Sequence, residues 1–135
     1  MKVTFVHLGR EHLGIEYLSA VLKQAGHETS LAHDPGLFTL EDNVFYSPAL
    51  AGLFGRKKDV IDDVLRQKPD LAVFSAYTST YPWVREVARE LKQASDVTVV
   101  VGGIHATLVP EVVIEDDFVD IVSVGLEVLF EVLHR

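Results

Sequence analysis

Apolar runs of strand length alternate with amphipathic helical segments along most of this chain. Residues 70–75 form a nearly continuous apolar run, which is typical of a strand covered on both faces. In the next segment, residues 81–94, apolar side chains recur at helical spacing. Because parallel neighbours need a dozen or more residues to connect, this alternation predicts a parallel sheet with right-handed crossovers.

The pattern predicts five strands and five helices. The strands are expected at residues 2–7, 27–32, 70–75, 96–101 and 119–124, and the helices at 13–25, 57–68, 81–94, 110–116 and 126–134. The first helix is expected to end at Gly26 and to bury Leu13, Tyr17, Leu18, Val21 and Leu22. The chain is therefore predicted to be one α/β domain over residues 1–135, a flavodoxin-like three-layer sandwich with a five-stranded parallel sheet of order 2-1-3-4-5.

In such a sheet, ligands bind outside the carboxyl ends of the strands, at the switch point between strands 1 and 3. The loops expected at this edge are residues 8–14, 76–80, 102–107 and 125–127. They are rich in glycine and small hydroxyl residues and hold no carboxylate cluster. This composition indicates a lining for a bulky ligand rather than a hydrolytic centre.

Residues 34–55 interrupt the alternation. Asp34-Pro35-Gly36 signals a turn, and six large apolar side chains follow without clear periodicity: Phe38, Phe45, Tyr46, Leu50, Leu53 and Phe54. This density of aromatic residues argues against disorder. We expect an ordered insertion that packs on its own domain, on a ligand or on a neighbour.

Composition excludes several classes of protein. Twelve basic against twenty acidic residues give a net charge of -8, which argues against binding along a nucleic-acid backbone. No segment reaches the roughly 18 apolar residues of a membrane span, and the absence of cysteine excludes thiol nucleophiles and iron–sulfur ligation within these residues. We expect a cytoplasmic protein with no nucleic-acid or membrane partner. Asp116, Asp117 and Asp120 are expected to form a solvated turn.

The run at residues 102–107, Gly-Gly-Ile-His-Ala-Thr, is predicted to be a ligand-facing loop, because glycine accepts positive φ and lets backbone N–H groups approach a bound group. His12 and His105 are expected to make polar contacts. Two histidines on separate loops, without carboxylates at ligand spacing, are a weak signal for a metal ion. Ser79 and Thr80 either contact the ligand or cap the following helix.

Other ligands of this fold class lack their motifs. Gly9 and Gly14 make neither the dinucleotide fingerprint nor a phosphate loop, so NAD and ATP have no support. A response-regulator receiver needs an acidic pair, an aspartate and a lysine where this chain has Leu8 and Gly9, Ser75 and Val124. FMN stays a weaker alternative, because residues 8–12 contain no Ser or Thr for a phosphate loop.

Several motifs together resemble a known family. Val101-Gly102-Gly103-Ile104-His105-Ala106-Thr107 with Pro110-Glu111, followed by Val119-Asp120-Ile121-Val122 and Gly125, resembles the N-terminal cobalamin (B12)-binding domain of B12-dependent radical SAM enzymes. Residues 13–18 and 26–28 are similar to the family's first helix and second strand. The likeness spans the chain outside the insertion, and the G-G-x-H-A-T-x-x-P-E run is its most specific part.

The resemblance implies a Rossmann-like domain that inserts the nucleotide tail of cobalamin among the loops after strands 1, 3, 4 and 5. The cofactor-binding residues that it implies are Gly9, Arg10, Glu11, His12, Leu13, Gly14, Ser75, Ala76, Tyr77, Thr78, Ser79, Thr80, Gly102, Gly103, His105, Ala106, Thr107, Gly125, Leu126 and Glu127. Tyr77 is expected to close over the corrin or the tail. The chain is expected to hold no catalytic residue and no metal ligand of its own.

Two departures refine this expectation. B12 domains of the methionine-synthase and mutase type carry D-x-H-x-x-G, whose histidine binds cobalt, whereas here Arg10 lies two residues before His12 and Ile15 three after it. The radical SAM likeness therefore implies cobalt without a histidine lower ligand, and ligation by His12 is the minor alternative. The family often has G-E-G-E after strand 5, whereas residues 125–128 read Gly-Leu-Glu-Val, which weakens the assignment of Glu127.

The radical SAM half, with its C-x-x-x-C-x-x-C motif, does not occur in these residues. The resemblance implies a radical SAM domain in cis or in trans, with a 4Fe-4S cluster and S-adenosylmethionine for methyl transfer or related radical chemistry. The chain is then either a free-standing carrier or one domain of a longer protein. An alternative from another class is a cofactor-free regulatory domain that docks through the aromatic insertion, and an FMN-binding electron carrier is a third.

Overall fold

A computed structural model describes residues 1–10, 12–40, 43–125 and 131. The strands are β1 (Lys2–Leu8), β2 (Glu28–Asp34), β3 (Leu71–Ser75), β4 (Thr98–Gly102) and β5 (Ile121–Val122). The helices are α1 (Leu13–Gln24), α2 (Pro48–Phe54), α3 (Lys57–Gln67), α4 (Tyr81–Ala94), α5 (Ile104–Leu108) and α6 (Pro110–Ile114).

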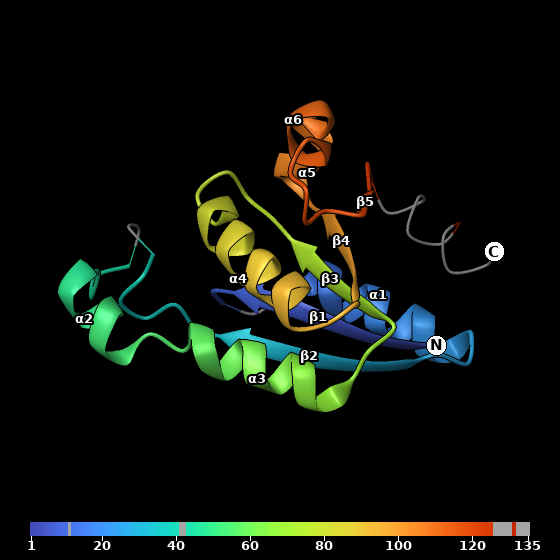
Figure 1. Ribbon diagram of the computed structural model, residues 1–135, viewed down its shortest axis with the longest axis horizontal. Coiled ribbons are helices and arrows are strands. Elements are labelled where there is room, and N and C mark those ends of the chain that lie inside the picture. Colours follow the sequence, from blue (N-terminus) through green and yellow to red (C-terminus); the bar gives the residue numbers. More distant parts are fainter. Residues whose placement is uncertain (11, 41–42, 126–130, 132–135) are drawn as a thin grey trace.

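All five strands lie parallel in one sheet of order β2-β1-β3-β4-β5 (Figure 1). β1 pairs with β2 along its whole length, from Lys2 opposite Glu28 to Leu8 opposite Asp34. The predicted α/β class and the strand order 2-1-3-4-5 are confirmed. The switch point therefore lies between β1 and β3, as expected.

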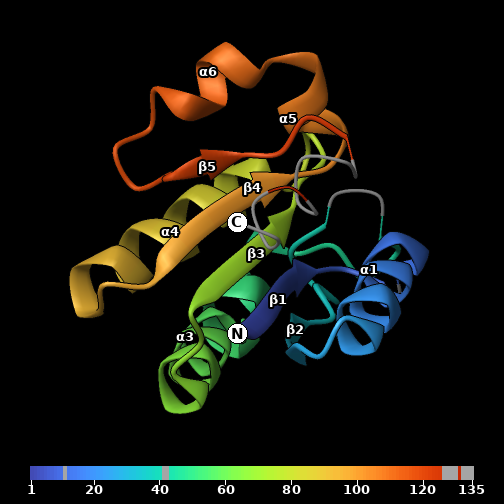
Figure 2. The same cartoon turned by 90° about the vertical axis from the view of Figure 1, so that its right-hand side faces the viewer.

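Helices cover both faces of the sheet (Figure 2). On one face, Ile15 and Leu22 of α1 pack in one apolar cluster with Phe5 of β1. On the other face, α3 and α4 cover a larger cluster that contains Val64 of α3 and Phe74 of β3. The sheet is thus the middle of three layers.

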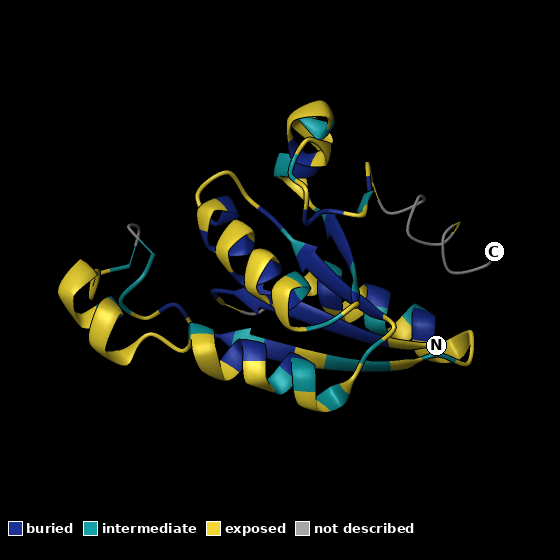
Figure 3. Cartoon of the chain, viewed as in Figure 1, coloured by how far each residue is buried: buried dark blue, intermediate teal, exposed yellow. Residues whose placement is uncertain are grey.

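The central strands are buried on both faces (Figure 3). Val99, Val100 and Val101 of β4 are 0% exposed, because successive side chains of a strand face opposite layers. The edge strand β5 is shorter than the predicted 119–124, since Phe118 and Val119 turn into the core before the pairing begins.

α1 buries a narrower stripe than the sequence predicts. Ile15, Leu18 and Leu22 are buried, whereas Leu13 and Tyr17 are 79% and 60% exposed. The predicted inward position of Leu13 and Tyr17 is therefore wrong. The buried stripe follows the spacing 15, 18, 22, and positions 13 and 17 fall on a flank that no described element covers.

α4 begins at Tyr81 as predicted, with Pro82 in its first turn. The N-cap residue Thr80 makes no side-chain bond to the helix. Its hydroxyl accepts the N–H of Tyr77 at 3.0 Å and donates to the carbonyl of Tyr77 at 3.2 Å. The capping role considered for Ser79 and Thr80 is therefore wrong: Thr80 closes the β3–α4 loop on itself, and Ser79 is exposed before the cap.

Between β2 and α3, the segment that contains α2 protrudes from one end of the sheet (Figure 1). Leu40 packs against the larger apolar cluster, and the rings of Phe38 and Phe54 lie 6.2 Å apart. No side chain of α2 is buried, and Phe45 and Leu53 are exposed. The segment thus packs on its own domain through Leu40 and leaves most of its apolar side chains outside.

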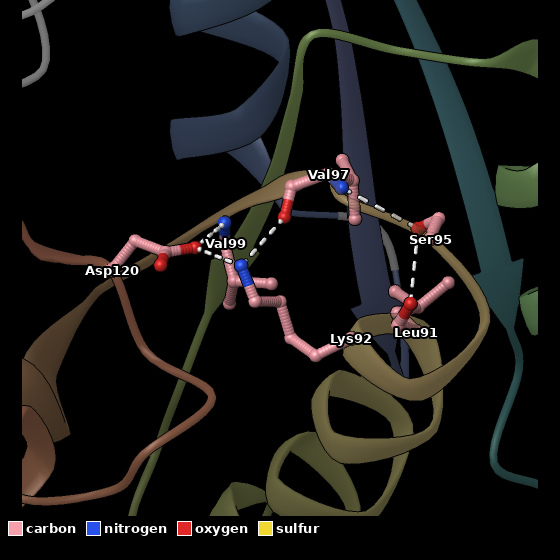
Figure 4. Close-up of polar contacts among 6 residues, drawn as sticks. All are labelled: Leu91, Lys92, Ser95, Val97, Val99 and Asp120. Atoms are coloured by element: carbon pink, nitrogen blue, oxygen red, sulfur yellow. Dashed lines mark hydrogen bonds and ion pairs between the residues drawn. The ribbon is translucent and has the colours of Figure 1, made fainter.

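Asp120 joins α4, β4 and the start of β5 (Figure 4). Its Oδ2 accepts the backbone N–H of Val99 at 2.8 Å and the Nζ of Lys92 at 2.9 Å. Lys92 also donates to the carbonyl of Val97 at 3.2 Å. Asp120 therefore serves as one more acceptor along the edge of β4.

Asp116 ties the same turn to α4. It accepts the hydroxyl of Tyr81 at 2.5 Å and a guanidinium N–H of Arg85 at 3.1 Å. Burial raises the pKa of Tyr81, and the hydrogen bond to Asp116 raises it further, so the phenol stays protonated. The expected solvated turn is therefore confirmed for the exposed Asp117 and Asp120 and is wrong for the half-buried Asp116, and the expectation missed the bonds that Asp116 and Asp120 make.

The helix predicted at residues 126–134 falls almost entirely outside the described residues, as do Glu11, Leu126 and Glu127. Within the part of the chain that the structure describes, no helix has the length and apolar character to cross a membrane.

Candidate functional site

A cavity of about 310 Å³ opens between α1 and α5, at the carboxyl ends of the central strands. Its walls are almost wholly apolar. The lining residues are Phe5, His12, Gly14, Ile15, Leu18, Val73, Phe74, Ser75, Gly102, Gly103, Ile104, Thr107, Leu108, Ser123 and Gly125. Four of these are glycines, which leave space that side chains would fill. We call this space the apolar cavity.

His12 forms one corner of the apolar cavity. It is the N-cap of α1, and its Nδ1 accepts the N–H of Ile15 at 3.3 Å. The ring can lie over the first turn because Gly14 has no side chain: a Cβ there would stand 2.9 Å from the Cε1 of His12. The His-x-Gly spacing thus fixes the place of the imidazole.

The second ring nitrogen of His12 faces two hydroxyl groups. Nε2 lies 3.2 Å from the Oγ of Ser75 and 3.2 Å from the phenol oxygen of Tyr77. Since Nδ1 accepts from Ile15, the neutral ring carries its proton on Nε2 and donates to these hydroxyls. His12 therefore joins the start of α1 to the β3–α4 loop.

Two histidines that were not among the predicted site residues extend this group inward. His7 and His33 stand opposite each other in the sheet register, with stacked rings 5.8 Å apart, and His7 lies 5.3 Å from His12. Nε2 of His7 donates to the carbonyl of Arg10 at 2.8 Å, and Nε2 of His33 donates to the carbonyl of Gly9. This histidine cluster (His7, His12 and His33) anchors the β1–α1 loop through its backbone.

Burial lowers the pKa of His7. The hydrogen bond to Arg10 raises it, and the nearby imidazoles of His12 and His33 lower it. The Nδ1 of His7 is buried and has no hydrogen-bond partner among the described residues. His7 is therefore neutral at neutral pH and acts as a donor to the loop.

The run at residues 102–107, predicted to be a ligand-facing loop, is a loop only in part, because α5 begins directly after Gly103. Gly103 has φ +93°, and a Cβ there would stand 2.7 Å from the backbone N of Ala76. The N–H of Ala76 donates to the carbonyl of Gly102 at 2.9 Å, and the N–H of His105 donates to the carbonyl of Ala76 at 3.0 Å. The expected positive φ is thus found at Gly103, whereas residues 104–107 are helical and not loop. The glycine locks β4 against the β3–α4 loop, and α5 forms a wall of the apolar cavity.

His105 makes polar contacts outside the apolar cavity. Its Nδ1 lies 3.1 Å from the Oγ1 of Thr78, and its ring stands 4.5 Å from that of Tyr81. These contacts tie α5 to the β3–α4 loop.

A second, more polar cavity of about 500 Å³ lies at the ends of β1 and β3. Its lining is His7, Leu8, Gly9, Arg10, His12, Pro35, Leu40, Asn43, Tyr77, Ser79 and Thr80. His12 lines both cavities and so stands between them.

The structure brings most of the predicted site residues to these two spaces. The apolar cavity takes His12, Gly14, Ser75, Gly102, Gly103, Thr107 and Gly125. The polar cavity takes Gly9, Arg10, His12, Tyr77, Ser79 and Thr80. Ala76 and Ala106 are buried in the core, and Leu13, Thr78 and His105 line neither cavity.

Seven residues of the apolar cavity lie outside the predicted loops and are not among the predicted site residues: Phe5, Ile15, Leu18, Val73, Phe74, Leu108 and Ser123. Most of them lie inside strands and helices, whereas the motifs that predicted the site lie in the loops after the strands. Among the described residues, no three histidine or carboxylate side chains are grouped so that they could hold a metal ion.

The comparisons with known proteins agree with this geometry. The family model of the B12 binding domain matches residues 8–129, from the end of β1 to beyond Gly125. The chain therefore belongs to the B12-binding domain family. No curated protein matches this B12-binding domain. Membership of this family supports a cobalamin-binding module.

The residues present fit part of that cofactor. The apolar cavity lies at the lower end of the range of about 300–1,000 Å³ that small-molecule pockets occupy. Its glycines and aliphatic walls suit a flat aromatic base, and Ser75 and His12 bring polar groups to one side. The B12-binding domain thus offers an apolar slot with a polar corner.

Proposed function

We propose that this B12-binding domain holds cobalamin at the carboxyl edge of its sheet, with the nucleotide tail in the apolar cavity. The cavity carries the proposal, because it combines glycine-lined walls with a location at the ends of β1, β3 and β4. Residues of the β1–α1, β3–α4 and β4–α5 junctions would hold the cofactor from three sides. When bound, cobalamin supplies the cobalt chemistry of methyl transfer or radical rearrangement.

We also propose that cobalt takes no lower ligand from the histidine cluster (His7, His12 and His33). A ligating imidazole nitrogen needs a free lone pair. The Nε2 atom of His12 carries the proton, and its Nδ1 lone pair faces the N–H of Ile15. His7 and His33 use their Nε2 atoms as donors to loop carbonyls, the Nδ1 of His7 is buried, and neither residue lines the apolar cavity. These bonds hold the β1–α1 loop in place, and that is the role we assign to the histidines.

Retention of a corrinoid tests the main proposal. The protein is mixed with hydroxocobalamin and desalted, and we expect its absorbance spectrum to keep the corrinoid bands. Gly102→Val is expected to lose them, because its side chain would start 3.5 Å from Ser123 and extend into the apolar cavity. Gly52→Val is the matched control, since a Cβ at Gly52 meets no atom within 4 Å. Complete loss of colour from the unaltered protein at micromolar concentration would refute the proposal.

The exposed apolar side chains of residues 34–55 favour a second candidate function, protein docking. The same experiment separates the two. Combined Phe45→Ala and Tyr46→Ala substitutions should leave the corrinoid bound if cobalamin binding is the function of the chain. A changed oligomeric state in a protein that never retains a corrinoid would favour docking.

We further propose that the module works with a radical SAM domain, in cis or in trans, that supplies a 4Fe-4S cluster and S-adenosylmethionine. The likeness at residues 101–111 and 119–125 supports this partnership. A three-cysteine motif in the reading frame beyond residue 135 or in an adjacent gene is the expected observation. The absence of such a motif from both places would argue against it. The cytoplasmic location and the lack of a nucleic-acid partner stay predictions.

A further inference from the structure

The neutral ring of His12 has a single N–H donor, which faces two hydroxyl groups. Its Nδ1 accepts the N–H of Ile15, which leaves the single ring proton on Nε2. The oxygens of Ser75 and Tyr77 stand at the same distance from Nε2, 3.2 Å each. Both distances are at the long end for an N–H···O bond, as expected when one donor serves two acceptors.

The two hydroxyls face different spaces. Ser75 lines the apolar cavity, and Tyr77 lines the polar cavity. When Ser75 accepts from His12, its own O–H is free to donate, and no bond from this hydroxyl to another group occurs among the described residues. A hydroxyl that accepts one hydrogen bond becomes a stronger donor of the next, because chains of hydrogen bonds polarise one another.

We propose that His12 is a positioning residue. We further propose that Tyr77 competes with cofactor-bound Ser75 for the hydrogen bond from the Nε2–H of His12. The Nε2–H of His12 orders the Ser75 hydroxyl as a donor into the apolar cavity, where it recognises an acceptor oxygen of the nucleotide tail. When that oxygen binds, the Nε2–H of His12 donates to Ser75 alone, and its hydrogen bond to the phenol of Tyr77 is lost. This inference rests on the proposed function.

The geometry explains why an imidazole serves here better than a simple cap. Asn, Asp, Ser and Thr cap helices as well, but their short side chains end close to the helix backbone. The imidazole caps α1 through one nitrogen and reaches the β3–α4 loop through the other. Gly14 makes room for this second reach.

Four variants and two corrinoids test the proposal. Cobalamin carries the nucleotide tail, and cobinamide lacks it. The dissociation constant of each corrinoid is measured by absorbance titration for the unaltered protein, His12→Asn, His12→Gln, Ser75→Ala and Tyr77→Phe. Tyr17→Phe is the matched control, because Tyr17 is exposed on α1 away from both cavities.

His12→Asn keeps a capping side chain but cannot reach Ser75, and Ser75→Ala removes the donor. Each should weaken cobalamin binding about tenfold, the size of one hydrogen bond to a buried partner. His12→Gln places an amide donor near the position of Nε2 and should recover part of the loss. Tyr77→Phe removes the competitor and should tighten cobalamin binding about threefold. Cobinamide binding should change little in all four variants.

A gain of affinity in Tyr77→Phe together with a loss in His12→Asn supports the proposal, because a purely structural role gives losses only. Weaker cobalamin binding by Tyr77→Phe, or equal effects on cobalamin and cobinamide, would overturn it. Thermal melts of each variant identify misfolding, and the Tyr77→Phe result still decides if His12→Asn fails to fold. If the unaltered protein binds neither corrinoid, the proposed function itself fails.

Discussion

Asp120 offers a sharp test of how the edge of this domain is held together. Its carboxylate accepts a backbone N–H of the buried strand β4 and pairs with the ammonium of Lys92. The two bonds make separable contributions. Asp120→Ala removes both bonds, whereas Asp120→Asn keeps an oxygen that can accept the N–H of Val99. Lys92→Met removes the ion pair and the bond from Lys92 to the carbonyl of Val97, and leaves the bond between Asp120 and Val99 in place.

The magnitudes follow from what each variant leaves unpaired. Val99 is 0% exposed, so Asp120→Ala strands a buried N–H, which costs about 1–3 kcal/mol. The ion pair is about one-third exposed on both sides and is worth about 0.2–1 kcal/mol. We expect Asp120→Ala to lower the free energy of unfolding by about 2–3 kcal/mol, and Asp120→Asn and Lys92→Met by about 0.5–1 kcal/mol each.

Urea unfolding followed by circular dichroism measures these differences. For a domain of this size, the loss in Asp120→Ala corresponds to a fall in Tm of roughly 6–12 °C. Asp117→Ala is the matched control, because Asp117 is exposed in the same turn, and it should stay within about 0.5 kcal/mol of the unaltered protein. The reasoning is refuted if Asp120→Asn is as damaging as Asp120→Ala, since the ion pair and not the acceptor would then dominate.

Two further predictions concern the β1–α1 loop. Burial lowers the pKa of His7 below 6.5, so the stability that its neutral form contributes is present above that pH and is lost as the pH falls through the folded-state value. His7→Gln keeps a donor for the carbonyl of Arg10 and should flatten the dependence of the urea midpoint on pH between about 5 and 7. A slope equal to that of the unaltered protein would contradict this account. Gly14→Ala should weaken cobalamin binding, because the added Cβ displaces the ring of His12 even though alanine has the higher helix propensity. Gly52→Ala is the control and should leave binding unchanged. Equal binding by both variants would show that the position of the His12 ring does not affect binding.

The topology could be predicted from the sequence because the buried strands have a local signal, a short run of apolar residues. A strand buried on both faces needs an apolar side chain at nearly every position, and residues 71–75 and 98–102 meet that need. Edge strands carry a weaker signal, and the length of β5 was overestimated for that reason. Val119 is apolar because it enters the core, and the periodicity cannot separate that cause from strand pairing.

The roles of Asp116 and Asp120 could not be predicted, because a carboxylate in an acidic run looks the same whether it is solvated or bonded. What distinguishes the two cases is the position of the partner. Val99 lies 21 residues from Asp120, and Tyr81 lies 35 residues from Asp116. Only the crossover of the chain brings them together.

The histidine cluster shows the same limit within the site itself. His7 and His33 become neighbours through the register of β1 and β2, and a shift of one residue would send one of the two rings to the opposite face of the sheet. Neither the register of β1 and β2 nor the face on which the two rings lie can be predicted from the positions of the two histidines in the sequence. The position of His12 is different, because the clash that a Cβ at residue 14 would cause is local. A histidine two residues before a glycine at a helix start therefore predicts an imidazole folded over the first turn, with one nitrogen committed to the cap and the other free to reach a neighbouring loop. That signal was present in residues 12–14, and it bears directly on the cobalt ligand: a histidine that caps its own helix has its Nδ1 lone pair engaged and its proton on Nε2, so it is a donor before any cofactor arrives.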